Sequence, residues 1–217
     1  MPRVLVAGMG FTVDFVLRRV ADLGRGEVLR VILVGLRTED RVSWERVLEA
    51  HRILSGYLKA LGIESELVEA PASEAGLLGR VRDALARAAS LAGEDGLVEV
   101  YLTGGPRILC LALTLASLTL PPGPRRRVRL VAYGEGFEAR LEVRADSLAA
   151  LLQLDEEHRA LLEALARLGR ARASRLLEEL GWNRSTLYLR LSRLEALGLV
   201  ARSGGEWMVH PAVEPLL

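Results

Sequence analysis

Short runs of β-branched and apolar residues alternate with longer amphipathic stretches over the first two thirds of the chain, and this alternation constrains the fold most. Six runs are expected to be strands, the last of them antiparallel after a turn at 134–136: residues 3–7, 28–35, 64–69, 97–102, 128–133 and 137–143. Four stretches between them have helical spacing of apolar residues: 12–23, 43–61, 74–91 and 106–120. This alternation predicts an α/β fold with a Rossmann-like, mostly parallel sheet.

The expected order of the strands indicates where a ligand would bind. Right-handed crossovers in the common doubly wound arrangement place the third, second, first, fourth and fifth strands side by side. The order then reverses between the first and fourth strands, and ligands of such sheets bind there, beyond the carboxyl ends of the strands. The two loops that matter are therefore 8–12 and 103–107.

The first loop has the composition of an anion site. Gly8 and Gly10 permit a ligand to approach the backbone closely, and the free N–H groups that open the next helix attract negative charge. A dinucleotide fingerprint would need a third glycine where Val13 stands and an acidic residue in place of Arg37, so the loop favours a phosphate over NAD. The ligand-binding candidates are Gly10, Phe11 and Thr12, with Arg37 as an addition from the second strand.

The second loop combines groups that suit the same ligand. It supplies a hydroxyl, two flexible peptides, a proline at the start of a helix and a guanidinium that can fork onto phosphate oxygens. The ligand-binding candidates are Thr103, Gly104, Gly105 and Arg107. A tight strand-to-helix turn with a solvated Arg107 is the alternative, but the facing loop at the switch point favours one shared site.

From about residue 155 the strand pattern gives way to three amphipathic helices and a hairpin. Leucines at helical spacing mark their buried faces: Leu161, Leu162, Leu165 and Leu168, then Leu176, Leu177 and Leu180, then Leu187, Leu191, Leu194 and Leu197. Strands at 199–202 and 207–210 form the hairpin. This succession resembles the winged helix-turn-helix of prokaryotic transcription regulators.

The third helix has a face that could enter the major groove of DNA. Asn183 is expected to be its N-cap, accepting from the free N–H groups of the next turn. Because the leucines occupy one side, Arg, Ser and Tyr side chains turn outward, where they can reach bases or phosphates. The DNA-binding candidates are Arg184, Ser185, Thr186, Tyr188, Leu189, Ser192 and Arg193, with Arg202 at the tip of the wing. A helical interaction module with solvated arginines is the alternative.

Composition disfavours several classes of protein. No apolar run reaches the roughly 20 residues needed to span a bilayer, and the chain opens on a strand pattern, so we expect a cytoplasmic protein without a membrane partner. Cys110 is the single cysteine and the three histidines are dispersed, so no disulfide, metal site or other cofactor is expected. The formal net charge is +1, so the placement of the arginines decides any contact with nucleic acid.

Together these features resemble a known family. The segment from Gly8 to Arg19, the Thr-Gly-Gly-Pro-Arg loop at 103–107 and the C-terminal helices look like the archaeal CRISPR-associated transcription regulators with an N-terminal CARF domain. The resemblance implies a C2 homodimer that binds a cyclic oligoadenylate, with the tetra-adenylate as first choice, and double-stranded promoter DNA. The domains would be a CARF domain for sensing and dimerisation over 1–144, a linker over 145–154 and a winged helix-turn-helix over 155–217.

Two other functions use the same loops. A ring nuclease would cleave the cyclic oligoadenylate with help from Thr12, Thr103 and Arg107, but no general base is evident, so we expect no catalytic residue and, at most, a side activity. A regulator could also sense another nucleotide, such as a dinucleotide. Arg46 and His51 form the Arg-x4-His pattern of HEPN ribonucleases, but they lie on a predicted crossover helix, which disfavours that chemistry.

Overall fold

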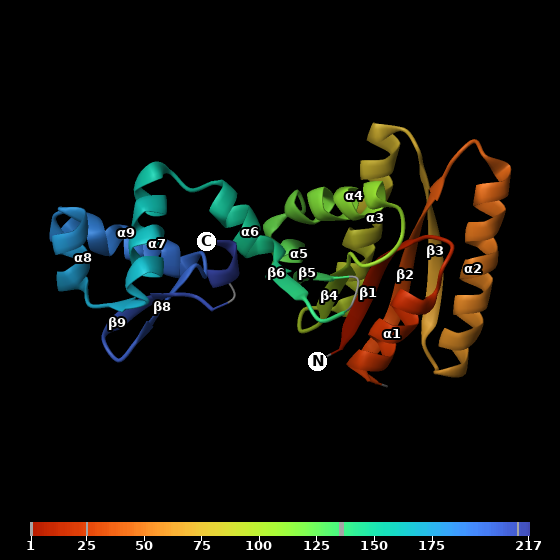
Figure 1. Cartoon of the computed structure of the whole chain (residues 1–217), viewed down its shortest axis with the longest axis horizontal. Helices are drawn as coiled ribbons and strands as arrows, with labels where there is room; N and C mark the ends of the chain where they lie inside the picture. The colour runs from red at the N-terminus through yellow and green to blue at the C-terminus, as the bar shows by residue number, and fades with distance from the viewer. Residues whose placement is uncertain (1, 25, 135–136, 212) are drawn as a thin grey trace. The chain divides into compact units, whose positions relative to one another are not determined.

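The chain folds into two compact units in a computed structural model that describes residues 2–24, 26–134, 137–211 and 213–217 (Figure 1). Unit 1 covers Met1–Ala145 and unit 2 covers Asp146–Leu217. Each unit has its own cluster of buried apolar side chains, so each is described by itself.

Unit 1 is built on a six-stranded sheet in the order β3-β2-β1-β4-β5-β6. The strands are β1 (Arg3–Met9), β2 (Val28–Arg37), β3 (Glu64–Pro71), β4 (Leu97–Tyr101), β5 (Val128–Tyr133) and β6 (Arg140–Arg144). The first five are parallel, and β6 pairs with β5 in the antiparallel sense. The predicted α/β fold and the predicted order of its strands are therefore confirmed.

Helices cover both faces of this sheet (Figure 1). They are α1 (Asp14–Leu23), α2 (Arg41–Ala60), α3 (Glu74–Ala92) and α4 (Arg107–Leu118). Alternate residues of β1 point to opposite faces, as strand geometry requires: Leu5 packs with α1 and α2, whereas the backbone of Gly8 lies against Leu109 of α4. A four-residue helix, α5 (Pro122–Arg125), lies between α4 and β5.

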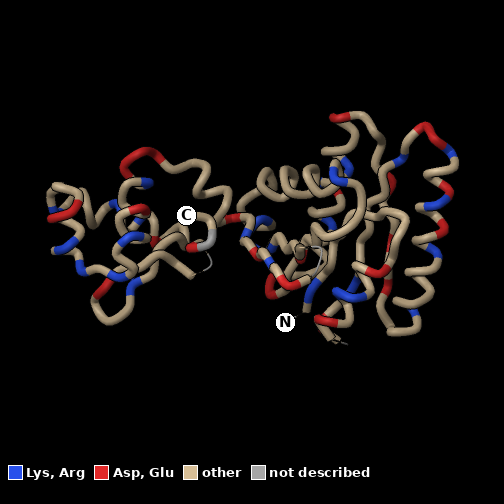
Figure 2. The backbone as a smooth tube through the Cα atoms, in the orientation of Figure 1, with Lys and Arg blue, Asp and Glu red and all other residues tan. Residues whose placement is uncertain are grey.

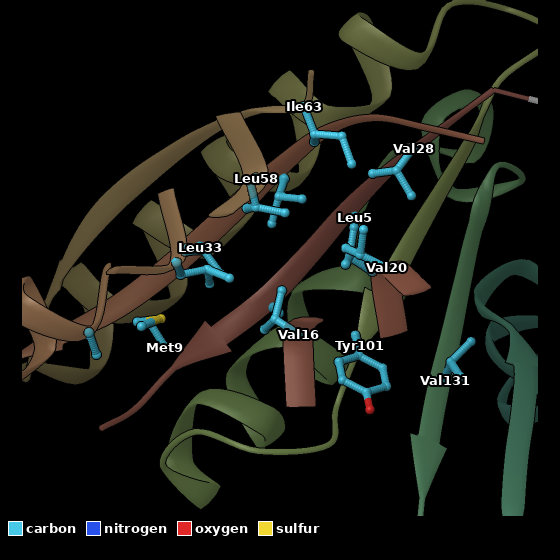
Figure 3. Close-up of a cluster of buried hydrophobic side chains, with 14 of the residues drawn as sticks. Leu5, Met9, Val16, Val20, Val28, Leu33, Leu58, Ile63, Tyr101 and Val131 are labelled. Atoms are coloured by element: carbon cyan, nitrogen blue, oxygen red, sulfur yellow. The ribbon is translucent and has the colours of Figure 1, made fainter. Parts of the chain in front are cut away.

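The main core of unit 1 lies between the sheet and the pair α1 and α2. Figure 3 shows Val16 and Val20 of α1 beside Leu5 and Tyr101 of the sheet. These four side chains are at most 4% exposed. Burial of such side chains stabilises a fold by about 1.5–3 kcal/mol each, so this layer holds α1, and the loop that precedes it, against β1 and β4.

Several predicted boundaries in unit 1 differ from the structure by one to three residues, and for two of them the reason is identifiable. Helix α2 begins at Arg41 rather than 43, because the Asp40 carboxylate caps it by accepting from the N–H groups of Val42 and Ser43. Strand β6 begins at Arg140 rather than 137, because Phe137 has a φ of 59° and its ring stacks on Phe15. The predicted turn at 134–136 lies partly outside the described residues.

Unit 2 contains α6 (Ala145–Leu152), which starts at the last residue of unit 1, followed by three helices and a small sheet. The elements are α7 (Glu156–Leu168), β7 (Arg170–Ala171), α8 (Ala173–Leu180), α9 (Arg184–Ala196), β8 (Val200–Ser203), β9 (Glu206–Val209) and η1 (Glu214–Leu216). The sheet is antiparallel in the order β7-β9-β8. Gly204 and Gly205 close the hairpin with φ values of 59° and 86°, as a two-residue turn requires.

The leucine pattern places most of the core of unit 2 correctly. Nearly all of the predicted leucines are buried or half-buried. Leu197 is the exception, because it is the C-cap of α9 and its side chain is 38% exposed. The two-residue strand β7 was not predicted, because so short a segment cannot show the alternation of apolar and polar residues that indicates a strand.

Candidate functional site

The two glycine loops of unit 1 meet at one edge of the sheet. Strands β1 and β4 are parallel neighbours, so the loops that follow them leave the same edge. A methyl group added to Gly10 would lie 3.2 Å from the Cα atom of Gly105. One added to Gly105 would lie only 2.7 Å from the carbonyl oxygen of Gly8. The backbones are therefore in contact, and a side chain at Gly105 would force them apart.

The conformation of the second loop also requires glycine. Gly104 and Gly105 have φ values of 93° and 73°, in the left-handed region that other residues rarely adopt. A methyl group on Gly104 would lie 2.8 Å from the ring of Phe15, a residue of α1. The loop after β4 thus packs directly on the helix that follows the loop after β1.

A cavity of about 660 Å³ opens beside this contact. Its volume is in the range of small-molecule sites. The lining residues come from three loops and the helices after them: Met9, Gly10, Phe11, Thr12, Phe15, Leu36, Thr38, Asp40, Ser43, Val47, Gly104, Gly105 and Pro106. Five predicted ligand residues line it, namely Gly10, Phe11, Thr12, Gly104 and Gly105.

Three other predicted ligand residues lie outside the lining of this cavity. The hydroxyl of Thr103 accepts from the N–H of Tyr133 at 2.7 Å, which ties it to β5. The guanidinium of Arg37 donates to Glu69 at 2.8 Å. Arg107 is exposed at the first position of α4 and, among the described residues, has no ion-pair partner.

The loop between β2 and α2 supplies cavity residues that the sequence analysis did not select. Thr38, Asp40 and Ser43 line the cavity from the start of α2. Their sequence signal is the N-cap: an aspartate three residues before a serine at the start of a helical pattern. Only Arg37 was considered in this segment, because the helix was expected to begin at 43.

The cavity wall formed by the glycine loops offers unpaired backbone donors. Across the part of the chain that the structure describes, the N–H groups of Gly10, Phe11, Gly104 and Gly105 have no hydrogen-bond partner. Because such groups need an acceptor, they suit an anion brought in from solvent. This wall therefore has the chemistry of a phosphate site.

The wall formed by the loop between β2 and α2 carries a carboxylate. The pKa of Asp40 is lowered, chiefly by the hydrogen bond from the hydroxyl of Ser43, so this group is ionised at neutral pH. Beside it, the guanidinium of Arg46 lies 4.2 Å from the centre of the Phe11 ring, and that ring is 49% exposed. The two walls of the cavity thus differ in charge.

A buried ion pair connects the elements that carry the two glycine loops. Arg19 of α1 donates to both carboxylate oxygens of Glu99 in β4, at 2.5 and 2.9 Å, and the two side chains are 4% and 1% exposed. Arg19 also donates to the hydroxyl of Tyr133 at 2.9 Å. Burial is the largest single influence and lowers the pKa of Arg19, but the hydrogen bond from Arg19 to Glu99 and the attraction of nearby negative charge, chiefly that of Glu99, together outweigh it, so the pKa is raised. The pair fixes α1 against β4.

The predicted DNA-binding residues lie on α9 and β8 of unit 2. The side chain of Asn183 accepts from the N–H of Thr186 at 2.9 Å, so the predicted N-cap is confirmed. Most of the candidates are exposed, with Leu189 at 74%, whereas Thr186 and Tyr188 are half-buried. The hydroxyl of Ser185 donates to Asn183, which reduces its freedom to bond elsewhere.

The exposed face of α9 is basic because two of its arginines are not paired with acidic side chains in the described residues. Arg184 lies against the ring of Tyr188, and, in the described parts of the chain, neither Arg184 nor Arg193 forms an ion pair. Arg190 is different, since it pairs with Asp155 and Glu157. Elsewhere acidic and basic residues are interleaved along the chain (Figure 2). Any contact with nucleic acid by unit 2 therefore depends on a few arginines.

Neither a membrane span nor a metal cluster is present in the described residues. Their helices are too short or too polar to cross a bilayer. Within the same ranges, no three His, Cys, Asp or Glu side chains are grouped as metal ligands.

Comparison with known proteins finds similar structures only. No protein-family model matches the chain, and no curated protein does. Can2 from Sulfobacillus thermosulfidooxidans, solved in complex with cyclic tetra-adenylate, aligns with 99% of this chain and 62% of its own, at 11% identity and a TM-score of 0.43. Protein VC1899 from Vibrio cholerae aligns with 98% of this chain and 63% of its own, at 14% identity and a TM-score of 0.41. The chain thus spans about three fifths of each structure.

Proposed function

We propose that this protein is a ligand-responsive transcription regulator of the CARF type. Unit 1 binds a cyclic oligoadenylate and unit 2, as a winged helix-turn-helix, binds promoter DNA. The observation that carries the proposal is the contact between Gly10 and Gly105, which brings two sets of unpaired backbone N–H groups to one cavity. Phosphates of the ring would accept from these groups.

The proposal includes a homodimer, because a cyclic tetra-adenylate can share a two-fold axis with two copies of the site. An apolar face on α3 and α4 supports it. Leu78, Ile108, Leu111 and Leu115 are between 36% and 59% exposed and line one shallow hollow. Helix α4 starts directly after the second glycine loop, so pairing through this face would bring two copies of that loop near each other.

Binding of DNA by unit 2 is supported by the basic face of α9 and by the hairpin that follows it. Arg184 and Arg193 are placed to neutralise phosphates or to bond bases. Binding of the ring would shift the population between DNA-competent and DNA-incompetent arrangements of the dimer.

We propose binding rather than cleavage of the ring. The three residues considered for a ring nuclease are not gathered at the cavity: Thr12 lines it, whereas Thr103 is bonded to Tyr133 and Arg107 lies outside the lining. The competing proposal is that the wall formed by the two glycine loops binds a different nucleotide.

Radiolabelled cyclic tetra-adenylate tests these proposals. The ring is incubated with the full chain, and bound, free and cleaved nucleotide are separated. Retention without cleavage is the expected result. Linear products would establish a ring nuclease, and the absence of retention would contradict the proposed ligand.

Selection of double-stranded DNA from a random library tests the role of unit 2. The affinity of the selected DNA is then measured against salt concentration. Arg193→Ala should weaken binding and reduce the magnitude of the salt slope by about 1, because one phosphate contact is lost. Arg41→Gln, which changes an exposed arginine of unit 1, is the control. No enrichment of any duplex by the wild-type protein would refute DNA binding.

A further inference from the structure

The two walls of the cavity suit different parts of a nucleotide. Backbone N–H groups of the glycine loops attract phosphate. The Asp40 carboxylate at the start of α2 repels it, and Leu36 and Val47 beside it are apolar. A ligand that fills the cavity therefore needs an anionic part for one wall, and a flat, uncharged part that donates hydrogen bonds for the other.

Phe11, although it belongs to the first glycine loop, provides a stacking surface that contacts α2 through Arg46. It is an aromatic side chain that is 49% exposed although it lines a cavity. The guanidinium of Arg46 lies 4.2 Å from the ring centre and holds the ring from one side by a cation–π contact. Among the described residues Arg46 forms no ion pair. Aromatic rings flanked by arginine are surfaces on which proteins stack nucleobases.

Asp40 has acceptor capacity left for a base. Its Oδ1 accepts from the N–H of Val42 at 3.1 Å, and its Oδ2 accepts from the N–H and the hydroxyl of Ser43. A carboxylate oxygen has two lone pairs, so Oδ1 can accept one more hydrogen bond. The donor that fits beside a stacked ring is an exocyclic amino group.

We propose that Phe11, Arg46 and Asp40 form an adenine-binding subsite: the base stacks on the ring of Phe11, and its amino group donates to the carboxylate of Asp40. The subsite rests on the proposed function, since it reads the bases of the ring whose phosphates the glycine loops bind. It also gives a role to Arg46, which is not part of the lining itself but contacts the ring of Phe11, and this role does not involve His51, which lies more than a helical turn further along α2.

The test compares two rings by calorimetric titration of the full chain. They are cyclic tetra-adenylate and cyclic tetra-inosinate, in which a carbonyl oxygen replaces each amino group. The wild-type protein should bind the adenylate ring at least about tenfold more tightly, because the inosinate oxygen faces the Asp40 carboxylate. Asp40→Asn should lose this preference while keeping α2 capped, since asparagine caps as well as aspartate.

Substitutions at Phe11 test the stacking surface. Phe11→Leu should weaken binding of the adenylate ring about ten- to hundredfold, whereas Phe11→Tyr should leave it nearly unchanged. Arg46→Gln should weaken it less than Phe11→Leu does. Arg41→Gln, on the same helix but paired with Glu45, is the matched control and should have no effect.

The outcomes separate this subsite from the proposed function. If neither ring binds the wild-type protein, both proposals are overturned. If both rings bind the wild-type protein equally and Phe11→Leu binds them as tightly, the phosphate site stands and the adenine subsite is overturned.

Discussion

Gly10 and Gly105 touch across the carboxyl edge of the sheet, so closely that a methyl group on Gly10 would lie 3.2 Å from the Cα atom of its neighbour. They are 95 residues apart in a chain that brings them together by placing β1 beside β4. This contact joins two loops with unpaired N–H groups into one surface, and everything proposed for unit 1 depends on it.

Gly105→Ala should separate the loops. The φ of 73° already costs a side chain about 1–3 kcal/mol, and the new methyl group would meet the backbone of Gly8, which cannot rotate away. Gly62→Ala is the matched control, because Gly62 has a φ of 77° with open space around it. Urea denaturation should show a larger loss of stability for Gly105→Ala. An equal loss for the two variants would mean that the loops are not in contact.

Arg19→Met should destabilise unit 1 by up to about 3–5 kcal/mol, because it removes the guanidinium that binds both oxygens of the buried Glu99 carboxylate and leaves only Arg3, at 2.9 Å, as a partner. A second substitution, Glu99→Leu, should restore much of the loss, since an apolar pair can replace a buried ion pair. Urea denaturation of the single and double variants measures both effects. A double variant no more stable than Arg19→Met would argue against the ion pair as the source of the loss.

Asp155→Asn should make unit 2 less stable at neutral pH but not in acid, because asparagine still caps α7 but carries no charge to pair with Arg190 and the His158 ring. The N–H of His158 is the main cause that lowers the pKa of Asp155 from 3.8 to about 2, with its ring and Arg190 adding to it. A lowered pKa in the folded state contributes stability above the unfolded value, and that contribution is lost as the pH falls through about 2. Thermal denaturation of the wild-type protein and the variant should therefore converge on acidification. A gap that is constant with pH would contradict the assignment.

Leu111→Glu should convert a dimer into monomers. Leu111 is 59% exposed at the centre of the apolar face of α3 and α4, where a buried charge without a partner would oppose association. Leu48→Glu is the control, because Leu48 is 41% exposed on α2 and is not part of this face. Light scattering after size-exclusion chromatography measures the mass. A wild-type monomer, or a Leu111→Glu variant that remains dimeric, would exclude this face as the interface.

The position of the cavity could be predicted from the sequence because it follows from strand order. Runs such as Val31 to Val34 are buried on both faces of the sheet, which is typical of parallel strands. Right-handed crossovers between such strands then permit only a few strand orders. The same reasoning predicts that Gly10 and Gly105 lie at one edge of the sheet. The prediction of strand order depends on the backbone alone and not on side-chain partners, which is why the structure confirms it.

The side chains at the cavity could not be predicted in the same way, because their partners are distant in sequence. The hydroxyl of Thr103 is bonded to a strand 30 residues later, and Arg37 is paired with Glu69 on the neighbouring strand. Asp40 was not predicted as a cavity residue, because the helix was expected to begin at residue 43 and Asp40 was therefore not recognised as its N-cap. Phe137 lies outside the strand that was expected to begin with it because it has a left-handed φ, which an aromatic residue at the start of a strand pattern does not indicate.

Calorimetric titration of cyclic tetra-adenylate into the full chain tests the central claim most directly. The account predicts saturable binding with a stoichiometry of about one ring per two chains, because two copies of the glycine loops share one ring. Gly62→Ala should bind in the same way, and Gly105→Ala should not. No binding, or one ring per chain with Gly105→Ala unaffected, would contradict the claim that these loops form the ligand site.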